Sequence, residues 1–463
     1  MELVMSNPRV VSLFQTTINQ LKAIQDIQGS VSLSNVPTVS LTSSVITQLM
    51  DIRAVSLGAT QINDLKQVIV GNLPKSGFGE VKVVQRTPLI EVKSAVDSVS
   101  LLRNVVTTVG GGAVAISDSE YLLSTTAAAS DSAILDTAER GRHLPGYEAT
   151  VGIGIRTLTG GPAITGDMER RWGYFTNDDG YFFGEDATGI YVASKRAGVI
   201  DQQIYQASWN ADKLNGTGLS GLTLDLTDGN IFQINYAWYG YGIILFELIG
   251  KFSPVGEYIF QKPVICHALD IRGKTSIEQP NLPIRAEIIN GTTATAHSLY
   301  VSGRQYTISG KYNPNYRLTG EFRGSVSTST TWVPLISFRR KSGSKFLAQS
   351  VKMDEFEIIG NSAPHILGFV LNGNLTGASW QTPTNHTITE TVCESDVSAT
   401  AITGGIFLGG FHIADASNKG RSALSQSGFD FDFIENQPVT LVVRTVSSTD
   451  SIVISSLNIR EEW

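Results

Sequence analysis

Two aromatic runs joined by a turn, Arg171-Trp172-Gly173-Tyr174-Phe175 and Tyr181-Phe182-Phe183-Gly184, decide the fold class of this 463-residue chain. Between them lies Asn177-Asp178-Asp179-Gly180. A glycine at the end of such a turn accepts the positive φ that a tight hairpin connection needs. Aromatic residues are also enriched in strands. The stretch therefore predicts a β-hairpin.

Further strand-like segments follow the hairpin and are not separated by any long helical period. They cover residues 189–194, 231–238 and 241–248. This density of short strands predicts a jelly-roll-like β-sandwich over residues 147–326.

A second group of strand-like segments predicts another β-sandwich domain over residues 327–463. These segments are residues 331–341, 366–371, 439–445 and 451–457. Nearby, Phe429, Phe431 and Phe433 alternate with Asp430 and Asp432. Because side chains of a strand point to opposite faces in turn, we expect the aromatic face inside and the acidic face in water.

Residues 1–105 differ from the rest because they contain no Trp, Tyr or His, and Val-Ser-Leu occurs five times among them. We expect an extended stem with short helices and strands. Val11, Phe14, Ile18 and Leu21 have the spacing of a narrow apolar helix seam, which predicts a short coiled coil. The alternative is a surface helix lying on a later domain. Residues 106–146, which include Gly110–Gly112, read as a connector.

The composition excludes several function classes. There are 35 Lys and Arg against 42 Asp and Glu, a net charge of −7, so we expect no nucleic acid partner. No run approaches the ~20 apolar residues of a membrane span. The N-terminus shows no signal-peptide pattern, which predicts synthesis in a cytoplasm.

Cys266 and Cys393 are expected as buried free thiols, with a single disulfide as the alternative.

No set of residues in the sequence has the pattern of a catalytic or metal site. The six histidines show no metal-ligand spacing. Glu355 and Glu357 share one strand face, as a retaining glycosidase pair would, but the simpler interpretation is a solvated face. We therefore expect a non-enzymatic protein without a cofactor.

One aromatic cluster is a candidate for sugar recognition. Trp238, Tyr239 and Tyr241 lie beside Gly240, and exposed rings of this kind can stack on sugar rings. Packing in the core is the alternative. A groove lined by Tyr239, Tyr241 and acidic side chains would favour the alternative function, a carbohydrate-binding receptor module or a glycosidase at a fibre tip.

Several segments together resemble a family of virion structural proteins of tailed phages and large DNA viruses. They are Trp172–Phe175 with Asp179–Phe183, residues 209–225, 231–238, 281–288, 337–341, 375–380 and 398–405. Residues 31–38 are similar to the Val-Ser-Asn-Phe-Pro repeats that precede such domains, with Val36 in place of the aromatic residue. The resemblance covers roughly residues 147–463. It implies a fibre or capsid decoration protein, assembled in the host cytoplasm onto capsid, neck or tail proteins, and it supplies no catalytic residues.

The stem and the resemblance together predict a homo-oligomer. Burying each apolar side chain of the seam is worth ~1.5–3 kcal/mol, which a monomer would forgo. The Val-Ser-Leu strands can also pair their edges between chains. Similarity to viral fibres makes a trimer the expected state, held by the N-terminal hundred residues.

Overall fold

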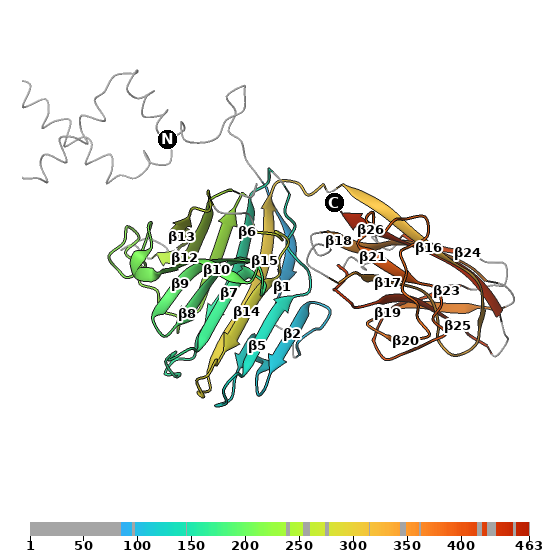
Figure 1. Cartoon of the computed structure of the whole chain (residues 1–463), viewed down its shortest axis with the longest axis horizontal. Helices are drawn as coiled ribbons and strands as arrows, with labels where there is room; N and C mark the ends of the chain where they lie inside the picture. The colour runs from blue at the N-terminus through green and yellow to red at the C-terminus, as the bar shows by residue number, and fades with distance from the viewer. Residues whose placement is uncertain are drawn as a thin grey trace, which may run out of the picture. The chain divides into compact units, whose positions relative to one another are not determined.

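Nearly all regular secondary structure in the described part of the chain is β-strand (Figure 1). The computed structural model describes residues 85–94, 98–144, 146–237, 241–252, 260–273, 277–313, 315–342, 349–360, 363–413, 419–423, 432–447 and 451–462. Within them are 26 strands, one short 3-10 helix and no α-helix. Val84–Trp463 forms one compact unit.

The strands of the first half are β1 (Arg86–Val92), β2 (Asn104–Val109), β3 (Ala113–Ser117), β4 (Glu120–Ser124), β5 (Ser132–Thr137), β6 (Ala149–Arg156), β7 (Glu169–Phe175), β8 (Gly180–Asp186), β9 (Gly189–Arg196), β10 (Val199–Tyr205), β11 (Asn230–Tyr236), β12 (Ile244–Phe252), β13 (Phe260–Leu269), β14 (Ile284–Ile289) and β15 (Ser298–Ser309). The 3-10 helix η1 (Gln206–Ser208) follows β10.

These strands form two antiparallel sheets. One has the order β13-β12-β11-β6-β15-β4-β3, with β1 as its eighth strand, and the other has the order β10-β9-β8-β7-β14-β5-β2. Along one edge β15 pairs with β6, and along the other it pairs first with β4 and then with β1. The two sheets share one buried hydrophobic cluster, so they form a β-sandwich.

Aromatic side chains join the two sheets of this first sandwich. Trp172 and Phe183 come from β7 and β8, and their rings lie 5.1 Å and 4.8 Å from the ring of Phe232 on β11. The β7–β8 hairpin predicted from the sequence is confirmed, with Phe175 opposite Gly180. Gly180 has φ +140°, and a Cβ there would lie 2.3 Å from the Cα of Phe175. Only glycine fits this position.

The strands of the second half are β16 (Tyr316–Thr328), β17 (Val333–Arg340), β18 (Ser350–Gly360), β19 (His365–Leu371), β20 (Asn374–Thr376), β21 (Cys393–Asp396), β22 (Ala401–Thr403), β23 (Ile406–Ile413), β24 (Lys419–Ala423), β25 (Val439–Thr445) and β26 (Ser451–Glu462). They form a second sandwich, with sheets β16-β26-β18-β24 and β21-β17-β25-β19-β23 and the separate ribbon β20-β22. Its core is a second buried cluster.

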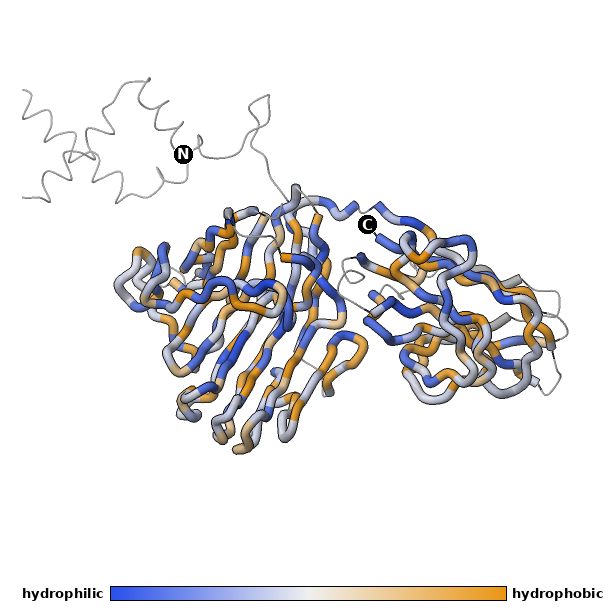
Figure 2. The backbone as a smooth tube through the Cα atoms, viewed as in Figure 1, coloured by the Kyte–Doolittle hydropathy of each residue, from blue (hydrophilic) through white to orange (hydrophobic). Residues whose placement is uncertain are grey.

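Several strands alternate in burial, as a strand with one solvated face requires, and hydrophobic and hydrophilic residues follow one another along the backbone (Figure 2). Others, such as β14 and β25, are buried almost throughout. In β26 every second residue from Ser451 to Ile459 is buried, and the intervening residues are exposed or half-buried. The mainly β fold with two sandwiches, predicted from the sequence, is therefore confirmed.

The boundaries differ from the expected ones. The connector predicted at residues 106–146 carries most of β2 and all of β3, β4 and β5, and β1 at the end of the predicted stem also joins the first sandwich. The second sandwich begins with β16 at Tyr316, earlier than the expected residue 327. These strands pair with partners far along the chain, such as β5 with β14, which a local pattern does not reveal.

Candidate functional site

Of the predicted oligomer seam and aromatic cluster, the structure describes only Tyr241. The predicted oligomer seam, Val11, Phe14, Ile18 and Leu21, lies outside the described residues, and so do Trp238 and Tyr239. Tyr241, in the loop between β11 and β12, is described and is 62% exposed. The Tyr241 ring is therefore not part of the core, which was the alternative to a role in sugar recognition.

Asp432 is the centre of a charged contact between the two sandwiches. Arg142, from the segment between β5 and β6, places Nη2 2.9 Å from Asp432 Oδ2. Arg340, at the end of β17, places Nη2 3.0 Å from Asp432 Oδ1, and the backbone N–H of Val351 donates to the same oxygen at 2.8 Å. Arg142 also donates to Ser350 Oγ on β18. We call Arg142, Arg340, Ser350 and Asp432 the inter-sandwich contact.

This finding corrects the expectation that Asp432 faces water. Asp432 is 4% exposed. Burial alone would raise the pKa of Asp432, but the charges of Arg142 and Arg340 and the Val351 hydrogen bond outweigh it and lower the pKa well below its usual range. Burial likewise opposes the charge of Arg142, and Asp432 reverses this effect and raises the pKa of Arg142. The ion pair thus compensates much of the cost of burying both charges.

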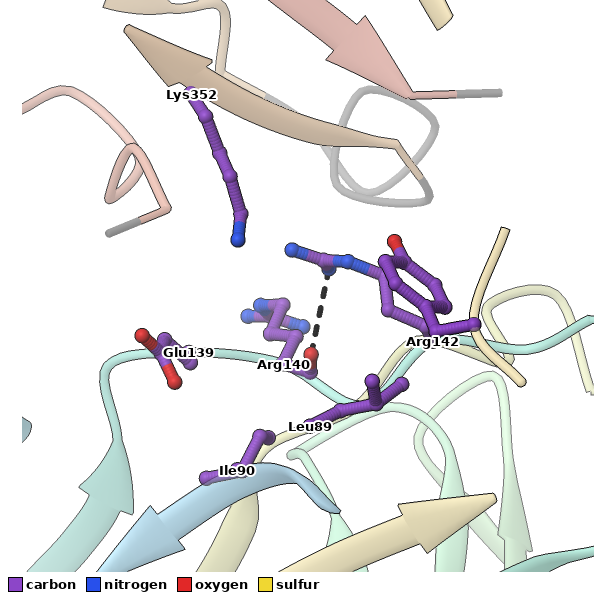
Figure 3. Close-up of a pocket in the computed structure, with 7 residues that line it drawn as sticks. Leu89, Ile90, Glu139, Arg140, Arg142 and Lys352 are labelled. Atoms are coloured by element: carbon purple, nitrogen blue, oxygen red, sulfur yellow. Dashed lines mark hydrogen bonds between the residues drawn. The ribbon is translucent and has the colours of Figure 1, made fainter. Parts of the chain in front are cut away.

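A small cavity lies beside this contact (Figure 3). It is lined by Leu89 and Ile90 of β1, by Glu139, Arg140 and Arg142 of the β5–β6 segment, by Tyr312 and by Lys352 of β18. Its volume is about 40 Å³. Burial raises the pKa of Glu139, although Arg103 opposes this effect. A cavity needs roughly 10–15 Å³ to hold one water, so this one suits a few waters and not an organic ligand.

A second hollow is larger and shares Arg140 with the first. Its volume is about 170 Å³, and we call it the polar cleft. The β7–β8 turn contributes Asn177, Asp178 and Asp179, Arg285 comes from β14, and Glu435 comes from the second sandwich. The lining is mostly polar, so the polar cleft is suited to a ligand that forms several hydrogen bonds.

The charged residues of this region form no recognisable site motif in the sequence. The signal available was the segment Glu139-Arg140-Gly141-Arg142-His143, which is dense in charge although only 17% of the chain is charged. Gly141 in its middle allows a close approach, because a Cβ there would lie 2.3 Å from the hydroxyl of Tyr174. The local pattern does not show that Asp432, about 290 positions further along the chain, is the partner.

The segment at residues 209–225, which carries much of the virion-family resemblance, is a loop held by its own polar residues. The Asn210 side chain exchanges two 2.9 Å hydrogen bonds with the backbone of Ala268. The Asp212 carboxylate accepts from the backbone N–H groups of Leu214 and Ser220 at 2.9 Å and 2.8 Å. Gly218 lies so close to this carboxylate that a Cβ would be 2.0 Å from Oδ1. These residues shape the loop.

The resemblance residues of the second sandwich have a similar role. The Arg339 guanidinium lies 4.2 Å from the ring centroid of Trp380 and is paired with Glu394 at 2.8 Å. Asp396 accepts hydrogen bonds from the backbone N–H groups of Ser379 and Ala399. The Arg339–Glu394 pair joins β17 to β21, and the hydrogen bonds to Asp396 tie the segments on either side of β21 to the end of that strand.

Cys266 and Cys393 are free and buried, as expected. Burial raises the pKa of both thiols, so they are not activated nucleophiles. Among the described residues, no group of three or more His, Cys, Asp or Glu side chains is placed to hold a metal ion. The same part of the chain contains no helix long and apolar enough to cross a membrane.

Comparison with known proteins identifies no family. No family model and no curated protein matches the chain. Similar solved structures include the Emp46p carbohydrate recognition domain (TM-score 0.26, 11% identity, covering 44% of this chain and 87% of that one). Arcelin-5 of Phaseolus vulgaris has a TM-score of 0.30 and 7% identity, covering 49% of this chain and 99% of its own.

An endo-1,3-beta-glucanase from Streptomyces sioyaensis is similar to the same degree, with a TM-score of 0.29 and 12% identity, covering 49% of this chain and 97% of its own. These lectin-like and glucanase structures carry no argument about function at such values. The fold class follows from the strands and sheets described above.

Proposed function

We propose that this chain is a non-enzymatic structural component of a virus particle, a fibre or decoration protein that joins capsid, neck or tail proteins. We further propose that it oligomerises, as a trimer, through its N-terminal stem. The resemblance of residues 147–463 to virion structural proteins supplies the class of particle.

The observation that carries the proposal is the role of the residues behind that resemblance. Trp172 is fully buried between the two sheets of the first sandwich. Asp212 and Asp396 accept hydrogen bonds from backbone N–H groups of their own loops. These contacts maintain a scaffold, which is what an assembly subunit requires.

The inter-sandwich contact gives further support. A carboxylate shared by two arginines, with an added backbone hydrogen bond, fixes both distance and orientation. It ties the segment before β6 to the segment before β25. A subunit that must present a fixed surface to its neighbours benefits from such a contact, because domains joined by small polar interfaces otherwise move relative to each other.

Sedimentation of virus particles tests the proposal. Antibodies against residues 85–462 should detect the chain in the gradient fraction that contains intact particles, and a high-salt wash should not remove it. Immunogold labelling should then decorate those particles. Detection only among free proteins at the top of the gradient, while the particles are complete, would contradict the proposal.

A second candidate function, sugar recognition, is favoured by the exposure of Tyr241. An exposed ring can stack on the apolar face of a sugar. Binding on a glycan array that is lost in Tyr241→Ala would support this alternative, and an array signal that Tyr241→Ala leaves unchanged would exclude this residue from the site.

A further inference from the structure

We propose that the polar cleft binds a neutral polyhydroxylated molecule the size of a single sugar unit. This inference goes beyond the structural role proposed above and does not depend on it. It rests on the cleft's volume and on hydrogen-bonding groups within it that the described residues only partly satisfy.

Arg140 is the first of these groups. It is half-buried, and it donates one long hydrogen bond, from Nη1 to the carbonyl oxygen of Asn281 at 3.3 Å. No carboxylate of the described residues lies within 4.0 Å of its guanidinium, in contrast to Arg142 and Arg285. A guanidinium has five N–H donors, so Arg140 has capacity for a ligand acceptor.

The second group is Asp179, which accepts hydrogen bonds, whereas Arg140 donates them. It is 2% exposed, and Oδ1 accepts two weak hydrogen bonds at 3.4 Å from the backbone N–H groups of Ala197 and Glu278. No cationic side chain of the described residues lies within 4.0 Å of this carboxylate. Burial raises the pKa of Asp179, which reflects this weak compensation. A ligand donor would compensate it.

The turn that carries Asp179 is fixed before any ligand arrives. Thr176 Oγ1 accepts from the backbone N–H groups of Asp178 and Asp179, both at 3.2 Å. Arg285 donates to Asn177 Oδ1 at 2.6 Å and is held in turn by two hydrogen bonds to Asp136. The amide of Asn177 therefore presents its N–H₂ group from a defined position, so little ordering is needed on binding.

The charge balance selects the ligand class. The cleft combines two arginines with the carboxylates of Asp178, Asp179 and Glu435. Arg285 is already paired with Asp136, so Arg140 is the guanidinium with donors to offer a ligand. An anion only accepts hydrogen bonds and would leave the carboxylates without a donor, and an ammonium ion only donates and would leave Arg140 without an acceptor. A hydroxyl group donates to a carboxylate and accepts from a guanidinium at once. Adjacent hydroxyls on one ring supply this pairing repeatedly, so the polar cleft fits a sugar.

Saturation-transfer NMR on the full chain tests the proposal with glucose, galactose, mannose and N-acetylglucosamine as probes, and with acetate, phosphate and ethylammonium as ionic probes. At least one sugar should receive saturation, and the ionic probes should not. Arg140→Gln and Asp178→Asn should each weaken sugar binding about tenfold or more, because hydrogen bonds to charged groups are strong. Arg272→Gln, a change at an exposed arginine that does not line the cleft, is the matched control.

Thermal unfolding of each variant shows whether the fold is kept, and Asp178→Asn changes an exposed turn residue that no core contact needs. Binding of no sugar, or tighter binding of acetate, phosphate or ethylammonium than of any sugar, would overturn the proposal. So would sugar binding that Tyr241→Ala abolishes while Arg140→Gln and Asp178→Asn leave it intact. The proposed particle role is tested separately by sedimentation, so failure of the sugar-binding proposal would leave it standing.

Discussion

At Asp432, burial and ion pairing act in opposite directions on one carboxylate. Desolvation disfavours its charge, and Arg142 and Arg340 restore it. Replacing the carboxylate with a neutral amide of the same shape removes the ion pair of Arg340 and leaves Arg142 with the more distant carboxylate of Glu462, at 3.9 Å. Buried ion pairs contribute little by themselves, but the loss of one partner is costly.

Asp432→Asn should therefore lower the free energy of unfolding by about 3–5 kcal/mol. Urea denaturation at neutral pH, followed by circular dichroism, measures this change. Asp270→Asn is the matched control, because its partner Arg272 is 69% exposed and the midpoint of unfolding should stay almost unchanged. Equal effects of the two substitutions would contradict the role given to Asp432.

The same carboxylate predicts a pH dependence. Asp432 has a pKa of about 3.9 in the unfolded chain and a lowered pKa in the folded protein. Its stabilisation is therefore fully present above about pH 4 and is lost as the pH falls towards the folded-state pKa. The stability difference between wild type and Asp432→Asn, measured by urea denaturation from pH 6 to pH 3, should shrink below about pH 4. A constant difference over this range would contradict the assignment.

Among single residues, the features that depend on local chemistry could be predicted from the sequence. The thiols of Cys266 and Cys393 and the glycine of the Asp179-Gly180 turn were predicted correctly. Asp432 was placed in water because alternation alone assigns an acidic residue to the outer face. The arginines that reverse this assignment lie on other segments, and their approach depends on tertiary folding.

Among the elements, the loop at residues 209–225 depends most clearly on close packing. Its Asp212 carboxylate occupies the space that a side chain at position 218 would need. Gly218→Ala should displace this carboxylate and lower the free energy of unfolding by about 1–3 kcal/mol, as overpacking does. Chemical denaturation measures the effect, and limited proteolysis should show faster cleavage in the loop.

Gly229→Ala is the control for this prediction. Nothing lies within 4 Å of a Cβ at Gly229, and its φ is not in the left-handed region. This substitution should leave stability and proteolysis almost unchanged. Tolerance of alanine at both positions would mean that Asp212 does not need the space beside Gly218.

Strands that pair with a neighbour in the sequence could be predicted, and strands that pair with distant segments could not. The β7–β8 hairpin was read from adjacent aromatic runs and one glycine. The strands β2 to β5 were assigned to a connector because residues 106–146 are rich in Gly, Ala, Ser and Thr. Their partners include β14 and β15, more than 140 positions further along the chain. Such pairing gives no nearby signal.

For the whole molecule, the strand boundaries define where the stem can be removed. Because β1 begins at Arg86, a deletion of residues 1–105 would remove a strand of the first sandwich, whereas a deletion of residues 1–84 leaves every described strand intact. The shorter deletion should yield a folded monomer by light scattering, and the full chain should be a trimer. A truncated protein that keeps the full oligomer mass would place the interface in the sandwiches.

The polar cleft could not be predicted from the sequence. The cleft combines a turn, an inter-strand segment and a residue of the second sandwich, which meet only in the folded unit. The particle role rests on a resemblance, and the glycan-binding role of the Tyr241 cluster stays a prediction.

Electron cryo-microscopy of intact particles tests the proposed role in the particle. We expect repeated density on capsid, neck or tail into which both sandwiches fit, with the stems of neighbouring copies joined. Particles whose density is fully assigned to other chains, and whose protein content lacks this chain although infected cells contain it, would contradict the proposed role.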